Sequence, residues 1–159
     1  ERELPRERWT DSGPSICELL YRSGSGLTPR PLKRIASGGE LSRVLLAAKV
    51  VMGSADHAGT LVFDEVDAGV GGATARSLAT VLADLAKTHQ VIVVTHLAQV
   101  AVVADAHYVV KKVDTGSGIP ETSLVPVEGD ERVAEIARML SGDSSPESLA
   151  HARAMLESL

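Results

Sequence analysis

The stretch TLVFDEVDAGVGG, residues 60–72, is an apolar run that ends in two adjacent carboxylates and then in glycines. A short apolar run bounded by turn residues predicts a buried strand over 60–64. Residues 73–88 follow with apolar side chains at helical spacing, and QVIVVT at 90–95 is a second apolar run. Strands that alternate with helices predict an α/β fold with a largely parallel sheet, covered on both faces.

The same patterns extend this prediction outward along the chain. We expect strands 60–64 and 91–95 to be buried on both faces and paired on both edges. Residues 73–88 should turn one set of side chains inward, namely Ala75, Leu78, Ala79, Leu82 and Leu85. Helix 37–53 should bury another set, Leu41, Val44, Leu45, Ala48 and Met52. The remaining expected elements are a strand at 16–21, a short helix at 97–104, strands at 108–110 and 122–127 joined by a turn at 113–118, and helices at 131–140 and 146–158.

Composition limits what this chain can do alone. Its 159 residues are 44% hydrophobic, which suits one globular domain. A net charge of −5 argues against a strong DNA or anionic-membrane binder, and 3% aromatic residues provide no platform for stacking bases. A single cysteine, Cys17, excludes a disulfide framework, and no apolar run is long enough to span a bilayer.

The stretch SGGE, residues 37–40, predicts a helix N-terminus that can hold an anion. Ser37 is a favoured N-cap residue, and Glu40 stands three positions later, as in a capping box. Gly38 and Gly39 let a phosphate approach backbone N–H groups without a Cβ in the way. An ordinary capped helix explains these residues equally well, so the stretch alone leaves both interpretations open.

Two carboxylates and an imidazole follow the two central strands. Asp64 and Glu65 end the first strand, and His96 follows the second. Because the carboxyl ends of parallel strands meet at one edge, where α/β proteins bind ligands, we expect these side chains to lie together. One carboxylate can hold Mg²⁺ through water, and the other can orient a water for attack on a phosphoryl group. Taken singly, an exposed acidic strand end and a packed histidine are the alternatives.

Read in chain order, these stretches resemble the motifs of ABC-type ATPases: the signature motif at 35–43, the Walker B strand and its catalytic Glu at 61–65, the D-loop at 66–69 and the switch-histidine strand at 93–96. Longer matches resemble the RecN family of bacterial DNA-repair ATPases, which are SMC-like: 31–43, 63–72, 95–101 and 132–142. The resemblance covers about residues 9–158.

The resemblance implies a fold more specific than the α/β class. It implies the C-terminal lobe of an ABC/SMC-type P-loop NTPase head, with a mostly parallel sheet flanked by helices and completed by an absent N-terminal half. Residues 1–10 would then be the end of a coiled coil or a linker, since they begin as a charged run that suggests the stub of a helix. Residues 11–159 would be the half-head.

Nucleotide-binding roles also follow from the resemblance. Ser37, Gly38 and Gly39 are implied to contact the γ-phosphate of ATP bound on a partner head. Glu40 stands where transporters usually carry Gln, as in the RecN and SMC-like branch. Asp67 is implied to act across the interface between two heads.

Catalytic roles are implied for three further residues. Asp64 is expected to support Mg²⁺ through water, Glu65 to orient the hydrolytic water, and His96 to sense the γ-phosphate. The cofactors implied are therefore ATP and Mg²⁺. Arg43, just after the signature motif, could support phosphate chemistry at the interface or form a salt bridge to the body of the head.

One departure from the family pattern limits the enzymology. No G-x-x-x-x-G-K-[ST] motif occurs in the sequence, so the amides and lysine that hold the β- and γ-phosphates must come from elsewhere. We expect ATPase activity in the complete head and an inactive chain in isolation. Half-heads of other SMC or ABC ATPases, transporter subunits included, and a non-catalytic dimerisation module are the alternatives.

The resemblance also implies partners and a location. The expected partners are the N-terminal half of the same protein, a second head in an ATP-sandwiched dimer, and DNA bound through the complete protein. No membrane contact is expected. The implied place of action is the bacterial cytoplasm, in association with the nucleoid, at DNA double-strand breaks.

Overall fold

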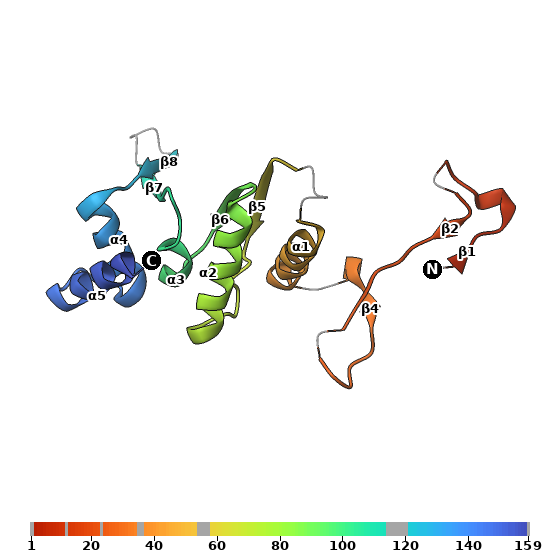
Figure 1. Cartoon of the computed structure of the whole chain (residues 1–159), viewed down its shortest axis with the longest axis horizontal. Helices are drawn as coiled ribbons and strands as arrows, with labels where there is room; N and C mark the ends of the chain where they lie inside the picture. The colour runs from red at the N-terminus through yellow and green to blue at the C-terminus, as the bar shows by residue number, and fades with distance from the viewer. Residues whose placement is uncertain are drawn as a thin grey trace.

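A computed structural model describes residues 2–11, 13–22, 24–34, 37–53, 58–113 and 121–158. The elements follow one another along an elongated arrangement, with β1 and β2 at the opposite end from α4 and α5 (Figure 1). In chain order they are β1 (Arg2–Glu3), η1 (Arg6–Arg8), β2 (Ser15–Ile16), β3 (Leu20–Tyr21), β4 (Arg30–Pro31), η2 (Leu32–Arg34), α1 (Gly38–Met52), β5 (Thr60–Asp64), α2 (Gly72–Ala86), β6 (Gln90–Val94), α3 (Ala98–Ala101), β7 (Tyr108–Val113), β8 (Glu121–Pro126), α4 (Gly129–Ser141) and α5 (Pro146–Glu157).

The centre of the fold is a strand–helix–strand unit made of β5, α2 and β6. β5 and β6 are parallel and pair in register from Thr60 opposite Gln90 to Asp64 opposite Val94. α2 packs on one face of this pair, and all five side chains expected to point inward from it are buried. The predicted strand–helix–strand unit is confirmed, because a continuous apolar stripe on α2 matches Leu61 and Phe63 on the strands.

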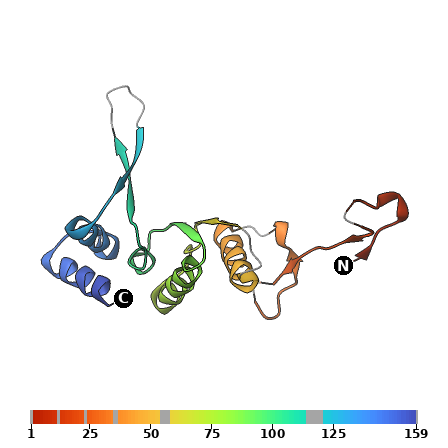
Figure 2. The same cartoon turned by 45° about the horizontal axis from the view of Figure 1, so that its top comes forward.

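Antiparallel pairs account for the other strands in the described part of the chain. β1 pairs with β2, β3 with β4, and β7 with β8. β7 and β8 form a long ribbon that projects away from the helices (Figure 2). The turn expected at 113–118 lies almost wholly outside the described residues. The α/β class is confirmed, with parallel and antiparallel pairing both present.

Burial of the central strands differs from the prediction. β5 and β6 pair only with each other in the described residues, and one face of the pair is open. Val62 is 60% exposed and Val94 is 57% exposed, whereas Phe63, on the opposite face, is 1% exposed. The expectation of burial on both faces is wrong for this chain, because α2 covers one face only.

α1 begins and ends where the sequence predicts but buries a different face. Ser37 is its N-cap and Gly53 its C-cap. Leu46 is buried against β5 and α2, whereas Leu41, Leu45 and Met52 are exposed. The prediction that this apolar stripe of α1 packs into the core is therefore wrong, because no element in the described residues covers it.

The N-terminal residues also depart from expectation. Residues 2–8 form a two-residue strand and a 3₁₀ turn rather than the stub of an α-helix. The strand predicted at 16–21 is divided into β2 and β3, because β2 pairs with β1 and β3 pairs with β4. The coiled coil or linker expected over 1–10 stays a prediction.

A second apolar cluster joins α3, α4 and α5, with Ile136 and Ala152 fully buried. Arg132 on α4 fastens this cluster to the end of α3, because its Nη2 donates to the carbonyls of Ala101, Val102 and Ala104. Burial, and then the positive charge of Arg132, lowers the pKa of the nearby His107.

Among the helices that the structure describes, none combines the length and the apolar character that a membrane span requires.

Candidate functional site

The N-terminus of α1 lies against the loop that follows β5. Ser37 has an extended backbone, and its hydroxyl accepts a hydrogen bond from the Glu40 amide at 3.4 Å, so the predicted N-cap is confirmed. A Cβ placed on Gly38 would lie 2.7 Å from Oε2 of Glu65. The carboxylate that ends the acidic pair is therefore already in contact with the first turn of α1. Ile35 and Ala36, which begin the signature-like stretch, lie outside the described residues.

Gly39 makes an equally close contact, but with the backbone of the loop as well as with side chains. A Cβ on Gly39 would stand 2.7 Å from the carbonyl oxygen of Glu65 and 2.8 Å from the Cβ of Ala68. Gly39 is buried, and real Cβ atoms essentially never approach so closely. Only glycine at this position lets α1 seat against the loop.

Two side chains from α1 fasten the helix to this loop. The Ser42 hydroxyl donates to the carbonyl of Asp64 at 2.6 Å. Nη1 of Arg43 donates to the carbonyls of Val66 at 3.2 Å and Ala68 at 2.8 Å. The hydrogen bonds of Arg43 are thus with backbone carbonyls, and neither predicted role, phosphate chemistry or a salt bridge, describes them.

The loop itself is a tight turn with an unusual backbone at Glu65. The φ of Glu65 is 55°, a left-handed conformation and the one positive φ at a non-glycine residue in the described chain. The Glu65 carbonyl accepts from the Ala68 amide at 3.0 Å, which closes the turn. Such a conformation costs roughly 1–3 kcal/mol and persists where surrounding contacts hold it, here those from Ser42, Arg43 and Gly39.

Asp64 and His96 stand at the same edge of the parallel pair, which we call the carboxyl edge because β5 and β6 both end there. Asp64 is opposite Val94 in the register, and the chain continues through Thr95 to His96. Asp64, Glu65 and His96 are all exposed. The strand pattern thus places the predicted side chains at one edge, open to a ligand, as the sequence predicts.

Asp67 is the exception to this exposure, because it is 2% exposed and turned inward. Its Oδ2 accepts hydrogen bonds from the Thr95 hydroxyl and, at 3.1 Å, from the His96 amide. The same oxygen lies 3.2 Å from Nδ1 of His96. In this chain the carboxylate faces residues of its own molecule, and its expected role across a head interface stays a prediction.

Two residues of the site, Ser42 and Thr95, were not assigned a role from the sequence, and the contacts of Arg43 differ from those expected. Ser42 and Arg43 lie one turn after the glycines, on the face of α1 that meets the loop. Thr95 precedes His96, and the polar residue after an apolar run was the signal that marked it as a strand end. Hydroxyl and guanidinium groups at such spacing can bond many partners, so the sequence alone does not identify which carbonyl or carboxylate they meet.

Metal chemistry at this edge would depend on ligands beyond the protein side chains. In the parts of the chain that the structure describes, no three His, Cys, Asp or Glu side chains gather as a metal site. Mg²⁺ needs few protein carboxylates, since it keeps several waters and takes oxygens from substrate phosphates. Asp64, exposed at a strand end, fits that need as a single carboxylate, with a nucleotide supplying the remaining oxygens.

The described residues therefore define a class of protein: an α/β lobe in which a glycine-rich helix N-terminus contacts the carboxyl edge of a parallel strand pair, consistent with a partial ABC- or SMC-type head. No family model matches the chain. By sequence the chain is RecN-like over nearly its whole length. It is 48% identical over 157 residues to the DNA repair protein RecN of Treponema pallidum, and that match covers 98% of this chain and 27% of the relative.

Other RecN proteins match this chain with similar identity and coverage. Identity to RecN of Deinococcus radiodurans is 50% over 145 residues, which is 91% of this chain and 25% of that protein. The chain thus spans about a quarter of the length of the curated relatives it matches.

Solved structures similar to this one are SMC ATPase heads. The SMC head domain from Thermotoga maritima shares 31% sequence identity and a TM-score of 0.46, over 65% of this chain and 37% of that chain. A chain from work on ATP-driven dimerization and DNA-stimulated activation of SMC ATPases shares 23% identity and a TM-score of 0.43, over 63% and 60% of the two chains.

Proposed function

We propose that this chain is the signature-bearing and Walker B-bearing part of an ATP-hydrolysing, RecN-like head. The observation that carries the proposal is the contact between Glu65 and the first turn of α1 at the carboxyl edge. It puts the carboxylate proposed to act on this head's nucleotide beside the helix N-terminus proposed to contact the nucleotide of a partner head, as a composite site between two heads requires. The P-loop comes from an N-terminal half outside this chain, since no such motif occurs in the sequence.

The work at the carboxyl edge divides among three exposed side chains. Asp64 would hold Mg²⁺ through water, and a bound Mg²⁺ would supply charge neutralisation for the nucleotide. Glu65 orients and deprotonates the attacking water, which is general-base catalysis. His96, from the neighbouring strand, meets the γ-phosphate or that water. The parallel register supports this division because it brings the two strand ends to the same edge.

The first turn of α1 serves a second nucleotide, held by a partner head. Ser37 and Gly38 are exposed, as a contact with another molecule requires, and Glu40 completes the turn. The helix N-terminus favours an anion, and in the nucleotide-free chain the Glu65 carboxylate lies beside it. The γ-phosphate of the partner head's nucleotide would repel the Glu65 carboxylate from the α1 N-terminus. The carboxylate would then move toward the attacking water at the nucleotide of its own head. ATP binding between heads would thus also orient the base.

The complete protein would couple this cycle to DNA. The curated relatives are DNA repair proteins, which supports a role in double-strand break repair and recombination. With a net charge of −5, this chain contributes little phosphate affinity itself, so DNA contact belongs to the complete protein. The place of action would be the cytoplasm, on the nucleoid.

Reconstitution tests the proposed function. The 159-residue chain alone should turn over ATP negligibly, because nothing in it replaces the P-loop. Adding the N-terminal half should restore hydrolysis well above that of either half alone, because the P-loop then positions the phosphates for transfer. Phosphate release would be measured for the chain, the other half and their mixture. Robust ATP turnover by the chain alone would refute the proposal that the P-loop comes from the other half. No turnover by the mixture would refute the proposed ATPase activity of the complete head.

Contact across two heads is tested by Ser37→Arg in the complete protein. A long cationic side chain fills the space before the first turn of α1 and opposes the positive end of the helix. ATP-dependent dimerisation should weaken at least about tenfold, while nucleotide binding by each head is retained. Analytical ultracentrifugation with and without ATP gives the measurement. Ser77→Arg, at an exposed position of α2, is the matched control, and normal dimerisation of the Ser37 variant would remove the role across heads.

A further inference from the structure

Asp67 is the single buried charged side chain in the described part of the chain, although it lies on a surface turn beside exposed Asp64 and Glu65. Burying a carboxylate is costly unless hydrogen bonds compensate it. Here its Oδ2 gathers the hydroxyl of Thr95 and the amide of His96, and it lies 3.2 Å from Nδ1 of the His96 ring. Every one of these partners belongs to the segment that follows β6.

Thr95 extends this arrangement by one more bond. Its hydroxyl donates to Asp67 and at the same time accepts from the amide of Leu97 at 3.0 Å. The backbone on both sides of the His96 α-carbon is therefore fixed, through its own amide and through that of the next residue. The His96 side chain is nonetheless 72% exposed, so the ring has one nitrogen beside a buried carboxylate and the rest in the open.

We infer that Asp67 is a positioning residue for His96, acting within one chain. The carboxylate beside Nδ1 favours the tautomer that carries its proton on that nitrogen. Nε2 of the neutral ring then has a free lone pair on a side chain that is 72% exposed, and it can accept a hydrogen bond from the attacking water. Thr95 supports this arrangement, because its hydroxyl bonds both the Asp67 carboxylate and the Leu97 amide.

This assignment rests on the proposed ATPase function and deepens it. It differs from the role implied by the motif resemblance, because the hydrogen bonds of the Asp67 carboxylate are to Thr95 and His96 of its own chain. Asp67 and Asp64, three residues apart on the same turn, thus do different work. Asp64 is exposed to the metal and its phosphates, and Asp67 is buried beneath the histidine.

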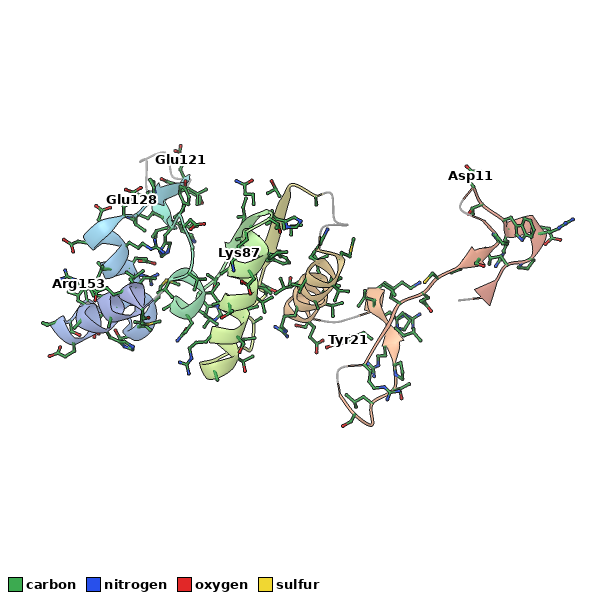
Figure 3. The ribbon with its side chains drawn as sticks, viewed as in Figure 1. Asp11, Tyr21, Lys87, Glu121, Glu128 and Arg153 are labelled. Carbon is green, nitrogen blue, oxygen red and sulfur yellow. The ribbon has the colours of Figure 1, made fainter. Side chains whose placement is uncertain are left out.

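The first test reads the geometry without any ATP. In the nucleotide-free complete protein, hydrogen–deuterium exchange of the His96 amide should be about tenfold faster in Asp67→Asn, which weakens its acceptor, and that of the Leu97 amide about tenfold faster in Thr95→Val, which removes its acceptor. Asp84→Asn is the matched control, since Asp84 pairs with Lys87 at the end of α2 that leads into β6 (Figure 3). A rise confined to this segment supports the inference. Unchanged exchange in both variants would overturn it, and so would a rise spread equally over β5 and α2.

The second test asks whether Asp67 acts through His96. In the ATPase assay, Asp67→Asn should lower kcat about 10–100-fold, the usual effect of removing an orienting partner, with KM for ATP little changed. In a His96→Ala background the same substitution should have no further effect, since the group it orients is gone. Additive losses would overturn the positioning role. A protein that shows the localised exchange but hydrolyses no ATP would instead overturn the proposed function and leave Asp67 as the residue that orients His96.

Discussion

Glu65→Gln in the complete protein should trap head dimers with ATP between them and reduce hydrolysis at least about 100-fold, the scale of losing a general base. The amide keeps the size and shape of the carboxylate, so Asp64 and the Mg²⁺ binding proposed for it should be retained. What is lost is the group that can take a proton from water. Single-turnover phosphate release and ATP-dependent sedimentation would measure the two effects.

The surroundings of Glu65 favour an isosteric replacement without loss of fold. Its backbone, with φ at 55°, is held by bonds to neighbouring carbonyls rather than by its side chain, and the side chain is exposed. Glu131→Gln, on the exposed surface of α4, is the matched control and should leave both turnover and dimer lifetime unchanged. Turnover equal to wild type in Glu65→Gln would mean that another group supplies the base.

The central unit was predictable because its signals are local. The stripe on α2 repeats at helical spacing through Ala75, Leu78 and Leu82, and each of these side chains is buried. β5 begins and ends at the predicted residues, since an apolar run is bounded by Gly59 on one side and the acidic pair on the other. Ser37 as N-cap and Gly53 as C-cap likewise depend only on neighbouring residues.

Burial was harder to predict because it depends on what covers a surface. The sequence of α1 has apolar residues on more than one face, and the structure buries Leu46 while it exposes Leu41 and Leu45. Val62 and Val94 are as apolar as their buried neighbours, but they lie on the open face of the strand pair. Cys17, within the stretch 16–21 predicted as a strand, is also exposed. Periodicity identifies a face and does not identify the element that packs on it.

At the candidate site, the sequence predicts which strand ends meet and not which atoms bond. Asp64 and His96 were expected at one edge because parallel strands end together, and the register agrees. Asp67 was expected, from the resemblance, to act across an interface between two heads, yet in this chain it is buried beneath His96. The direction in which a turn residue points depends on the backbone of that turn, and here a left-handed Glu65 sets it.

Adding a methyl group to each of the two glycines at the α1 N-terminus should affect the stability of the head differently. A Cβ on Gly38 meets the end of the flexible, exposed Glu65 side chain, which can turn away. Gly38→Ala should therefore fold with wild-type stability. A Cβ on Gly39 meets the Glu65 carbonyl and the Ala68 Cβ, neither of which can move without opening the turn. Gly39→Ala should destabilise the head by about 1–3 kcal/mol, as overpacking does.

The comparison of the two variants separates packing from catalysis. Urea unfolding of the complete protein reports stability, and ATP turnover reports function. Gly39→Ala should lower the unfolding midpoint and turnover together, because the turn that carries Glu65 and Asp67 is displaced. Gly38→Ala should leave the midpoint unchanged and lower turnover by moving only the Glu65 carboxylate. Equal unfolding midpoints for the two variants would show that α1 does not pack against the loop through Gly39. Only at Gly39 would the added methyl group meet the backbone of the loop.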